Sequence, residues 1–537
     1  MNFDWNAGYP SMRLPVFARN IVSTSHPLAA QAGLSLLQRG GNAVDAAIGA
    51  AAAMAIVEPC SNGLGSDAFC IVWDGQQLHG LNASGPSPAA WTLEYFREKY
   101  GDGARQPPVR GWDSVTIPGA VAAWVELSKR FGKLPLADVL APAIEIAQRG
   151  FAVPVVVHQK WAAAVADLED IPGFAETFLP DGRAPRVGER FAFPAAARAL
   201  RAIADTHGEA FYGGEIAAAA AAHAARHGGV MRVSDFEAFS PEWVQPIGMD
   251  VYGHRLHQIP PNGQGIAALI ALGILQHLDL AAHPVDAAAG QHLQIEAMKL
   301  GFADTYAHVA DPNGMRLSVQ QMLNPAYLEK RARLIDPKRA QVFGEGHLDK
   351  GGTIYLTAAD ERGMMVSFIQ SNYMGFGSGV VVPEWGLSLQ NRGHAFSLDP
   401  ESPNCVAPRK RPFHTIIPGF LTRNGVPQMS FGVMGGNMQP QGHLQTLVRM
   451  LVHRQQPQAA CDAPRWRFNQ GLSINVEASM PDATRRELMA YGHQIDVIQD
   501  SYQDFGAGQF IWRLGDPAVE GYVAASDPRR DGQAAGY

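Results

Sequence analysis

A threonine that follows two glycines is the residue in this sequence best suited to nucleophilic catalysis. The stretch "KGGTIYLTAADERGMMVSFIQSNY" covers residues 350–373 and places Thr353 directly after Gly352. If Thr353 became the first residue of a chain, it would carry a hydroxyl nucleophile and an α-amine with a pKa of about 8, which can act as general base. Attack of the Thr353 hydroxyl on the Gly352 carbonyl would cleave the bond between them and create that arrangement.

The same stretch has a simpler interpretation, in which Thr353 is a β-branched residue that begins an ordinary strand. Residues 353–359 and 364–371 flank the turn sequence "ADERG", a pattern typical of a β-hairpin. The hairpin places Gln370, Ser371 and Asn372 beside Thr353. A shift of one residue in register decides which of them shares its face, and the stretch by itself favours the ordinary strand.

Other motifs give no sign of a cofactor or a metal. The loop "GFGSGVV" at 375–381 lacks the GxGxxG frame and the Lys-Ser/Thr pair of nucleotide-binding loops, and no GxSxG motif is present. His223 and His227 are four residues apart on an expected helix, but they form no HExxH motif and have no evident third ligand. We interpret them as surface histidines and expect no cofactor and no metal.

The composition indicates a globular protein with a small substrate. The chain has 537 residues, 47% hydrophobic and 17% charged, and a formal net charge of −7, which suits either two domains or one large layered body. Lys and Arg are scattered, so we expect no nucleic acid as partner. The longest apolar run, 43–57, contains Asp45 and is shorter than the ~20 residues that span a bilayer. It predicts a buried helix, and we expect no membrane partner.

The beginning of the chain and its cysteines favour a cytoplasmic location. The first residues, "MNFDWNAGYPSMRLPVF", lack the basic start and apolar core of a secretory signal. The cysteines show neither CxxC spacing nor disulfide density, so we expect free thiols in a reducing compartment. They are Cys60, Cys70, Cys405 and Cys461.

Helical patterns come first along the chain and strand patterns later. Two helices are expected between His26 and Cys60, with Asn42 capping the second. Further helices are expected at 136–149, 193–204, 215–226 and 291–310, and strands at 353–359, 364–371, 414–421 and 426–435. The charged, glycine-rich segment 329–352 predicts an exposed, mobile connection. The order indicates helices and antiparallel sheets in layers, with a junction near residue 350.

Blocks along nearly the whole chain resemble the gamma-glutamyltransferase (glutathione hydrolase) family of N-terminal-nucleophile hydrolases. In chain order they are "GGNAVDAA" (40–47), "VTIPGAV" (115–121), "PPNGQG" (260–265), "EAMKLGFAD" (296–304), "FGSG" (376–379), "KRP" (410–412), "MGG" (434–436) and "ASDPRRDGQAAGY" (525–537). The resemblance implies an α+β fold, a four-layer αββα sandwich. It also implies autocleavage, which here gives a large subunit, 1–352, and a small subunit, 353–537.

The resemblance also implies roles for particular residues. Thr353 corresponds to the family's nucleophile, and Ser371 to a hydroxyl residue beside it. Gly435 and Gly436 correspond to the residues whose backbone N–H groups form the oxyanion hole, where a side chain would block the close approach of the oxyanion. One precursor therefore supplies both subunits, and a dimer of the two-subunit unit is left open.

Departures from the family pattern fall on the substrate-binding positions. Asn82 stands where glutathione-using members have an arginine for the substrate carboxylate, and Ala395 where they have an acid for its ammonium group. His414 and Thr415 replace a pair of serines, and Tyr373 replaces an asparagine. Because each charge-assisted contact contributes ~1.5–3 kcal/mol, a γ-glutamyl substrate would lose much of its binding.

The segments "SNYMGFGSG" (371–379), "LQNRG" (389–393) and "RPFHTIIPGF" (411–420) resemble an intracellular branch of the family that includes hydrolases of oxamate, a small carboxylate amide. Arg392 or Arg411 could then bind the carboxylate through two parallel hydrogen bonds. We interpret Arg411 as structural, because glutathione-using members share its block. Asn82, Asn372, Tyr373, His414 and Thr415 would shape the pocket. Three functions stay open: hydrolysis of a small amide, hydrolysis or transfer of γ-glutamyl groups, and an uncleaved, inactive scaffold that binds a ligand.

Overall fold

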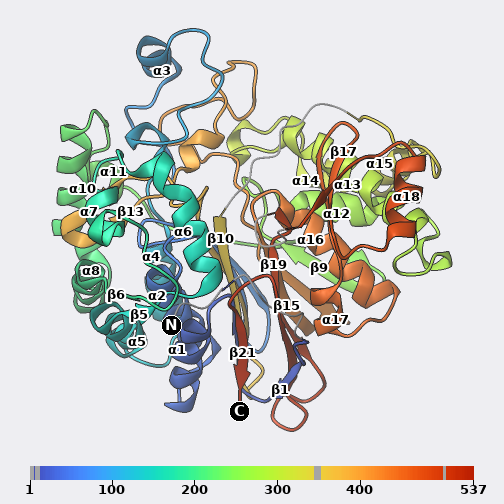
Figure 1. Cartoon of the computed structure of the whole chain (residues 1–537), viewed down its shortest axis with the longest axis horizontal. Helices are drawn as coiled ribbons and strands as arrows, with labels where there is room; N and C mark the ends of the chain where they lie inside the picture. Colours follow the sequence, from blue (N-terminus) through green and yellow to red (C-terminus); the bar gives the residue numbers. More distant parts are fainter. Residues whose placement is uncertain (1–4, 6–11, 344–351, 500–503) are drawn as a thin grey trace.

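The protein is built from two antiparallel β-sheets packed face to face, with helices on the outer face of each (Figure 1). The computed structural model describes Trp5 and residues 12–343, 352–499 and 504–537. The four layers confirm the αββα sandwich expected from the sequence. Each sheet has seven strands, and the strands of one sheet come from both sides of residue 352.

The first sheet carries the hairpin that begins at Gly352. The two hairpin strands lie at its centre, and shorter strands from the first half of the chain flank them. In spatial order the strands are β21 (Gln533–Gly536), β2 (Ile21–Thr24), β10 (Gly352–Ala359), β11 (Met365–Tyr373), β3 (Asp67–Trp73), β4 (Leu78–Ala83) and β7 (Glu242–Val244).

The second sheet has a long central strand, β15 (Val426–Met434), that packs against β10 of the first sheet. In spatial order the strands are β1 (Val16–Ala18), β20 (Tyr522–Ser526), β19 (Ala507–Arg513), β15, β14 (Gly419–Arg423), β9 (His254–Gln258) and β8 (Ile247–Val251). A smaller sheet of β16 (Trp466–Gln470), β17 (Ser473–Glu477) and β18 (Gln494–Ile498) lies beyond this layer.

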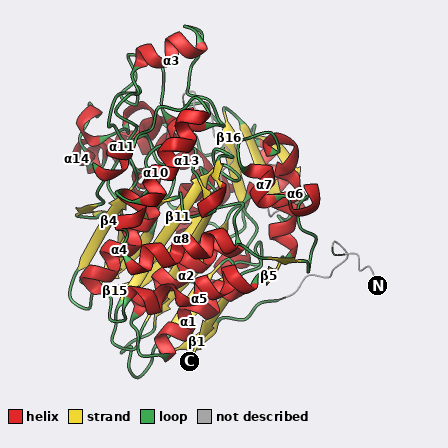
Figure 2. Cartoon of the chain, turned by 90° about the vertical axis from the view of Figure 1, so that its left-hand side faces the viewer, coloured by secondary structure: helices red, strands yellow, loops and turns green. Residues whose placement is uncertain are grey.

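Separate sets of helices cover the two outer faces. Figure 2 shows the helices over the first sheet, with α2, α5 and α8 in front of the strands. These are α1 (Pro27–Gln38), α2 (Ala43–Val57), α4 (Ala120–Phe131), α5 (Leu136–Arg149), α6 (Val155–Leu168), α8 (Pro194–Asp205) and α10 (Glu215–Arg226). On the second sheet lie α12 (Gly265–Leu275), α13 (Ala288–His308), α15 (Pro325–Ala332), α16 (Met438–Leu447), α17 (Pro457–Asp462) and α18 (Asp482–Ala490).

Alternation along β10 assigns its residues to two different layers. Ile354 and Leu356 belong to the core between the first sheet and its helices, whereas Tyr355 belongs to the core between the two sheets. Successive side chains of a strand point to opposite faces, so the side chain of Thr353 lies on the same face as that of Tyr355. The threonine hydroxyl is therefore directed into the layer between the sheets.

Helix α2 forms as the sequence predicts, and all of its residues are buried. The Asn42 side chain accepts hydrogen bonds from the backbone N–H groups of Val44 and Asp45, and Asp45 accepts from the Asn42 N–H, which completes a capping box. Asp360, in the turn of the β10–β11 hairpin, accepts from the N–H of Ala43. The helix and the hairpin are thus joined at the start of α2.

Several sequence expectations about the elements were wrong. Strands were expected only after residue 352, but β2, β3 and β4 all precede it. The strand expected at 414–421 begins at Gly419, since Pro418 has no N–H for the ladder. Part of the connection expected at 329–352 belongs to helix α15. Residues 344–351 lie outside the described part of the chain.

His223 is buried rather than a surface histidine. Its Nδ1 accepts a hydrogen bond from Trp112 Nε1 at 3.1 Å, and its ring lies 4.4 Å from that of His227. Burial lowers the pKa of His223 to about 4, so its ring is neutral at physiological pH. The four cysteines are free thiols, as expected. Within the described ranges, no helix is both long and apolar enough to cross a bilayer.

A buried ion-pair network fixes the end of β20 to the small sheet. Asp527 Oδ2 lies 2.8 Å from Arg465 Nη2, and Asp527 Oδ1 lies 3.1 Å from Arg529 Nη1. Arg529 also donates two hydrogen bonds of 2.6 Å to Glu477. Burial would raise the pKa of Asp527, but the two arginines lower it to about 2. Asp527 is therefore ionised, and it balances buried positive charge.

We predict that Asp527→Ala destabilises the protein by about 3–5 kcal/mol, because two guanidinium groups lose a buried partner. The urea concentration at the midpoint of unfolding measures this loss. Asp250→Ala is the control, since Asp250 pairs with Arg255 at the surface and its loss should cost about 0.5 kcal/mol or less. The Asp527 contribution is complete above the ordinary carboxyl pKa near 4 and is lost as the pH falls toward 2. Equal midpoint shifts in the two variants would contradict the prediction.

Candidate active site

Two hydroxyl groups meet where β10 begins and β11 ends. Ile354 pairs with Gln370, whereas Gly352 pairs with Tyr373, so a register shift lies between these pairs. It brings Thr353 Oγ1 to 3.1 Å from Ser371 Oγ. Both residues are buried. The register that the sequence left open therefore places Ser371 on the face of Thr353.

Ser371 also contacts the carbonyl group that precedes Thr353. Its Oγ donates to the Gly352 carbonyl oxygen at 2.7 Å and accepts from the Tyr373 backbone N–H at 2.8 Å. A hydroxyl group has one proton and two lone pairs. Because the proton is directed to Gly352, the remaining lone pair accepts the hydroxyl proton of Thr353. The result is a chain of hydrogen bonds from Thr353 through Ser371 to the Gly352 carbonyl.

A pair of glycines lies opposite Thr353 at the end of β15. The Tyr355 ring packs on Gly432, and Thr357 Oγ1 lies 2.6 Å from Ser430 Oγ, so β10 and β15 run in opposite directions across the two sheets. Two residues before Tyr355 on β10 therefore correspond to two residues after Gly432 on β15. This places Thr353 near Met434 and the two glycines that follow it.

Gly435 and Gly436 adopt backbone conformations that other residues rarely take, with φ of +118° and +59°. Neither backbone N–H donates to another group within the described part of the chain. The Gly436 carbonyl oxygen, in contrast, accepts from Gln264 Nε2 at 3.1 Å. The turn is thus fixed through its carbonyl side while its N–H groups stay available to an oxyanion.

A buried arginine lies behind Tyr373. The Arg392 guanidinium lies 4.5 Å from the centre of the Tyr373 ring, and its Nη1 donates to Thr415 Oγ1 at 2.7 Å. Its Nε and Nη2 atoms are buried and have no hydrogen-bond acceptor among the described residues. Burial lowers the pKa of Arg392 to about 10, so the group is still charged at neutral pH. Two donors of this buried cation therefore lack an acceptor among the described residues.

Asp67 and His414 form a buried pair near this arginine. His414 Nε2 lies 3.1 Å from Asp67 Oδ2, and His414 Nδ1 accepts from the Ile416 N–H at 3.4 Å, so we assign the His414 proton to Nε2. Burial, and then Arg392, lowers the pKa of His414 well below its usual value. Burial raises the pKa of Asp67 to about 7, although Arg392 opposes the rise. The contact is therefore a hydrogen bond from a neutral imidazole.

A cavity of about 210 Å³ adjoins these groups. Tyr373 and Thr415 line it on the side of Arg392, and Asn437, next to Gly436, lines it on the side of the glycine turn. Ala395 also lines the cavity, at the position where the sequence resemblance implied an acid in glutathione-using members. Of the described residues that line it, none carries a formal charge at neutral pH. The positive charge next to this cavity therefore comes from Arg392, which lies behind Tyr373 and Thr415.

Not all residues predicted for the site have polar atoms directed into this cavity. The Asn82 side chain donates to Asn262 Oδ1 at 3.0 Å and accepts from Ser84. The Asn372 side chain accepts from Ser66 and donates to Ser388. Both amides are thus engaged within the protein, and neither residue lines the cavity.

Arg411 lies apart from the cavity as well. It pairs with Glu242 at 2.6 Å and donates to the Ser84 carbonyl oxygen. The Arg411 side chain is thus engaged by Glu242 and Ser84, as a structural role requires.

Sequence reasoning missed two residues of the site. Asp67 begins an apolar strand in "GSDAF", and a carboxylate at the start of a buried strand is a signal that was available. Gln264 belongs to "PPNGQG", a block recognised as a resemblance without a role for its members. Its Nε2 donates to both the Thr415 and Gly436 carbonyl oxygens. Only the folded chain shows that these two segments share one donor.

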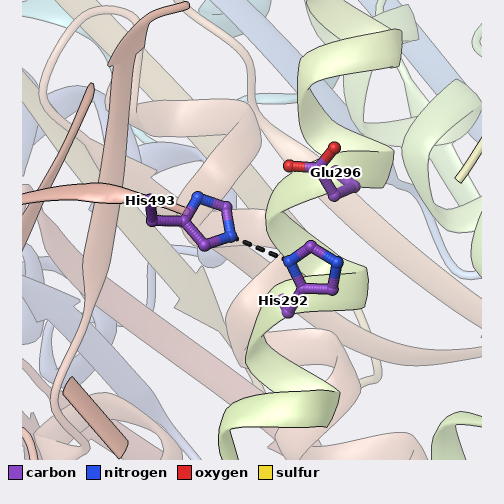
Figure 3. Close-up of side chains that lie close together, drawn as sticks. All are labelled: His292, Glu296 and His493. Carbon is purple, nitrogen blue, oxygen red and sulfur yellow. Dashed lines mark hydrogen bonds between the residues drawn. The ribbon is translucent and has the colours of Figure 1, made fainter. Parts of the chain in front are cut away.

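A second polar cluster, of His292, Glu296 and His493, lies on α13 and beside β18 (Figure 3). Its potential ligand atoms lie within 4.8 Å of one another, and His292 Nδ1 is 2.8 Å from His493 Nε2. However, the two Glu296 oxygens are engaged by Lys299 Nζ at 2.6 Å and by the Gln341 N–H at 3.1 Å. We interpret the cluster as a buried salt bridge, because Lys299 already supplies the positive charge that a metal ion would bring.

A larger groove of about 630 Å³ lies away from Thr353. Trp73 and His257 help to line it, and Trp73 ends the strand that Asp67 begins. The groove therefore lies at the opposite end of the first sheet. The smaller cavity is lined by Tyr373 and Thr415, which contact Arg392, and by Asn437, which follows the glycine turn.

A threonine hydroxyl at the start of a strand, directed into the layer between two sheets, is the arrangement expected of an N-terminal-nucleophile hydrolase. The gamma-glutamyltranspeptidase family model matches residues 29–537, and the chain belongs to this family of proenzyme-type amidohydrolases.

Relatives and a solved structure match over almost the whole chain. The oxamate amidohydrolase proenzyme of Klebsiella pneumoniae is 37% identical, with 95% of this chain and 97% of the relative covered. The glutathione hydrolase-like YwrD proenzyme of Bacillus subtilis is 34% identical, with 96% and 98% covered. The crystal structure of cephalosporin acylase from Bacillus halodurans is 46% identical, with a TM-score of 0.94 and coverage of 100% and 99%.

We predict that Asp67→Asn changes how stability depends on pH. Between pH 4, near the ordinary carboxyl pKa, and about pH 7, the folded protein keeps a proton on Asp67 that the unfolded chain releases. Asp67 therefore makes wild-type stability fall as the pH rises through this range. The difference in melting temperature between wild type and Asp67→Asn should change steadily from pH 4 to 7, in favour of the variant at the higher pH.

The control for this measurement is Asp250→Asn, which replaces an exposed carboxylate and should keep the wild-type pH dependence. Parallel melting profiles of wild type and Asp67→Asn would mean that Asp67 titrates at an ordinary pKa.

Proposed function

We propose that the chain cleaves itself between Gly352 and Thr353 and then hydrolyses a small carboxylate amide, such as oxamate. The large subunit is residues 1–352 and the small subunit residues 353–537. Thr353 is the nucleophile, Ser371 its hydroxyl partner, and Gly435 and Gly436 form the oxyanion hole. The observation that carries the choice of substrate is Arg392, a buried cation with two unpartnered donors behind an otherwise uncharged cavity.

Autocleavage follows from the hydrogen bonds of the intact chain. Thr353 Oγ forms a bond to the Gly352 carbonyl carbon, its proton passes to Ser371 Oγ, and Ser371 gives its own proton to the carbonyl oxygen. The C–N bond of the resulting cyclic intermediate then breaks, and the nitrogen takes the proton from the former carbonyl oxygen. Water hydrolyses the ester that remains. The products are the Gly352 carboxylate and the free α-amine of Thr353, and the 3.1 Å and 2.7 Å contacts of Ser371 support this path.

Turnover uses the amine that cleavage creates. The α-amine takes the Thr353 hydroxyl proton as Oγ attacks the substrate amide carbon, and the Gly435 and Gly436 N–H groups bind the oxyanion. The C–N bond then breaks, and the leaving nitrogen takes the proton from the α-ammonium. An ester to Thr353 Oγ remains. Water attacks this ester, gives a proton to the amine and releases the acid, and the ester oxygen regains its proton.

Arg392 is the proposed partner of the substrate carboxylate. A guanidinium group can form two parallel hydrogen bonds with a carboxylate, and Nε and Nη2 lie on the same edge of that group. Tyr373 and Thr415 would orient the arginine, since one covers its face and the other accepts from Nη1. His414 would influence the site indirectly, through its hydrogen bond to Asp67. Asn82 and Asn372 would hold neighbouring residues in position rather than contact the substrate, because their amides form hydrogen bonds within the protein.

The names of the relatives support amide hydrolysis but differ in substrate, since they include an oxamate amidohydrolase, a cephalosporin acylase and a glutathione hydrolase-like protein. The second candidate is therefore a γ-glutamyl hydrolase or transferase. Asn82 and Ala395 weigh against it, because neither supplies charge for a zwitterion. An inactive scaffold is disfavoured by the intact set of Thr353, Ser371 and the glycine turn.

We also propose a cytoplasmic location, which the four free cysteines support because thiols persist in a reducing compartment. The two subunits, both derived from one precursor, would remain associated after cleavage. Each central sheet contains strands from both of them, so their separation would expose the core between the sheets.

We predict that Thr353→Ala remains a single chain and that Ser371→Ala slows self-cleavage by about 100-fold, the usual effect of losing one donor to a developing oxyanion. Denaturing gels of a time course after cell-free synthesis measure this rate. Ser367→Ala is the matched control, because Ser367 lies on the same strand and face but contacts Tyr355 and Phe431. A single full-length band from active wild-type protein would contradict self-cleavage.

We predict that a small acid amide is a better substrate than glutathione and that Arg392→Lys lowers kcat/KM for it by about 10-fold or more. Lysine keeps the charge but loses the paired donors. Self-cleavage should continue, because the substrate carboxylate takes no part in it. Ammonia or amine release from oxamate, glutaryl amides and glutathione measures the preference. Arg411→Lys is the control, since Arg411 pairs with Glu242 away from the cavity.

A tenfold preference of the wild type for glutathione would favour the γ-glutamyl function instead. Unchanged kinetics of Arg392→Lys would mean that another group binds the carboxylate.

A further inference from the structure

We propose that Gln439 is a further catalytic residue, whose side-chain amide donates a hydrogen bond to the nucleophilic oxygen of Thr353. Gln439 Nε2 lies 3.4 Å from Thr353 Oγ1, and both side chains are buried. The proposal rests on the assignment of Thr353 as the nucleophile, and it adds a donor that the sequence did not indicate. This donor would fix the orientation of the attacking oxygen and stabilise the negative charge that develops on it.

The orientation of the Gln439 amide follows from a second contact. Its Oε1 accepts from the Ile417 backbone N–H at 2.8 Å, so the opposite end of the amide, which carries the donors, faces Thr353. The Gln439 N–H donates to the Gly436 carbonyl oxygen at 3.1 Å. Helix α16 (Met438–Leu447) begins directly after the glycine turn and Asn437, and Gln439 lies in its first turn. The oxyanion turn and the amide donor are held by the same segment.

The hydrogen-bonding capacity of Thr353 Oγ explains what this contact can do. A hydroxyl group has one proton and two lone pairs, and in the intact chain the proton is directed to Ser371. One lone pair accepts from Gln439, which leaves the other to attack a carbonyl carbon. Without Gln439 the two lone pairs would be equivalent, and rotation about the Thr353 side chain would be less restricted. The contact therefore selects one attacking geometry.

Other glutamines on α16 show what a structural role looks like. Gln441 and Gln445 are also buried, but their amides hydrogen-bond to the backbone of β16, at Phe468 and Trp466. They connect the helix to the small sheet. Gln439 differs because its donor is directed to a side-chain hydroxyl at the active site. Gln445 therefore provides a matched control in the same helix.

Two variants separate the donor from the anchor to Ile417. Gln439→Leu removes both contacts. Gln439→Glu keeps an acceptor for Ile417 but presents an oxygen without an amide proton to Thr353. A purely structural role predicts that the glutamate variant works like wild type, whereas a donor role predicts that both variants are slow.

The experiment measures the rate of self-cleavage after cell-free synthesis, and kcat and KM for oxamate or the best small amide. We expect both Gln439 variants to lose about 2- to 10-fold in self-cleavage rate and in kcat, the usual contribution of one hydrogen bond, with KM within about twofold of wild type. Gln445→Leu should lower the melting temperature but keep both rates within about twofold. Circular dichroism establishes that each variant is folded.

Wild-type rates in either Gln439 variant would overturn the proposal, as would a change confined to KM. If the wild type cleaves itself but hydrolyses no small amide, the proposed substrate fails, and the self-cleavage rates alone decide the role of Gln439. If the wild type does not cleave itself, the assignment of Thr353 fails, and the role of Gln439 fails with it.

Discussion

The close packing of Tyr355 on Gly432 is the contact on which the geometry of the active site depends. A Cβ atom at Gly432 would lie 2.4 Å from the Tyr355 ring, so only glycine allows β10 and β15 to approach in this way. Because the two strands run in opposite directions, this contact sets the alignment of one sheet against the other. It brings the start of β10, with Thr353, to the end of β15, where the glycine turn follows. Residues 82 positions apart in the chain thereby share one site.

The layer between the sheets contains pairs of hydroxyl groups as well as apolar side chains. Thr357 pairs with Ser430, and the Tyr355 hydroxyl pairs with Ser367 at 2.7 Å. The contact between Thr353 and Ser371 continues this series to the end of the hairpin. Buried hydroxyls without partners are costly, so each pair satisfies its own hydrogen-bonding needs. The proposed nucleophile therefore belongs to a series of hydroxyl pairs at the sheet interface. Its pair differs from the others because the carbonyl group that Ser371 contacts, that of Gly352, belongs to the peptide bond before the nucleophile itself.

The sequence predicted those elements whose signals are local. Helix α2 has a capping residue and a stop signal, and the β10–β11 hairpin has a clear turn, so both were found close to their observed bounds. The strands before residue 352 were missed for two reasons. The apolar run in β3 is buried and lacks the alternation that marks a half-exposed strand, and β4 contains few strand-forming residues. The resemblance to known relatives supplied the layered fold that these local signals could not.

Local sequence signals predicted the candidate site less completely than they predicted the elements of the fold. Thr353 and the glycine turn carry recognisable neighbours, whereas the contact with Ser371 depends on a bulge between Gly352 and Ile354 that shifts the register by one residue. Gln439 gave no signal, and the carboxylate of Asp67 at the start of an apolar strand gave only a weak one, because the role of a buried amide or carboxylate depends on the residues that it contacts in the fold. Asn82 was expected to shape the pocket, but its polar atoms form hydrogen bonds with the neighbouring residues Asn262 and Ser84 instead. Long-range pairing of this kind is absent from any local pattern.

The burial of Arg392 links the cost of the site to its proposed selectivity. A charge removed from water is destabilising unless it is paired, and Asp67 contributes only partial compensation because its own pKa is raised to about 7. A substrate carboxylate that reached Nε and Nη2 would complete the pairing and recover part of this cost. Its binding would be strong for a small anion and weak for a zwitterion, whose ammonium group would find no acid at Ala395. Tyr373, whose φ is +79°, places its ring 4.5 Å from the Arg392 guanidinium and covers one face of it, so a carboxylate would approach this group along its edge.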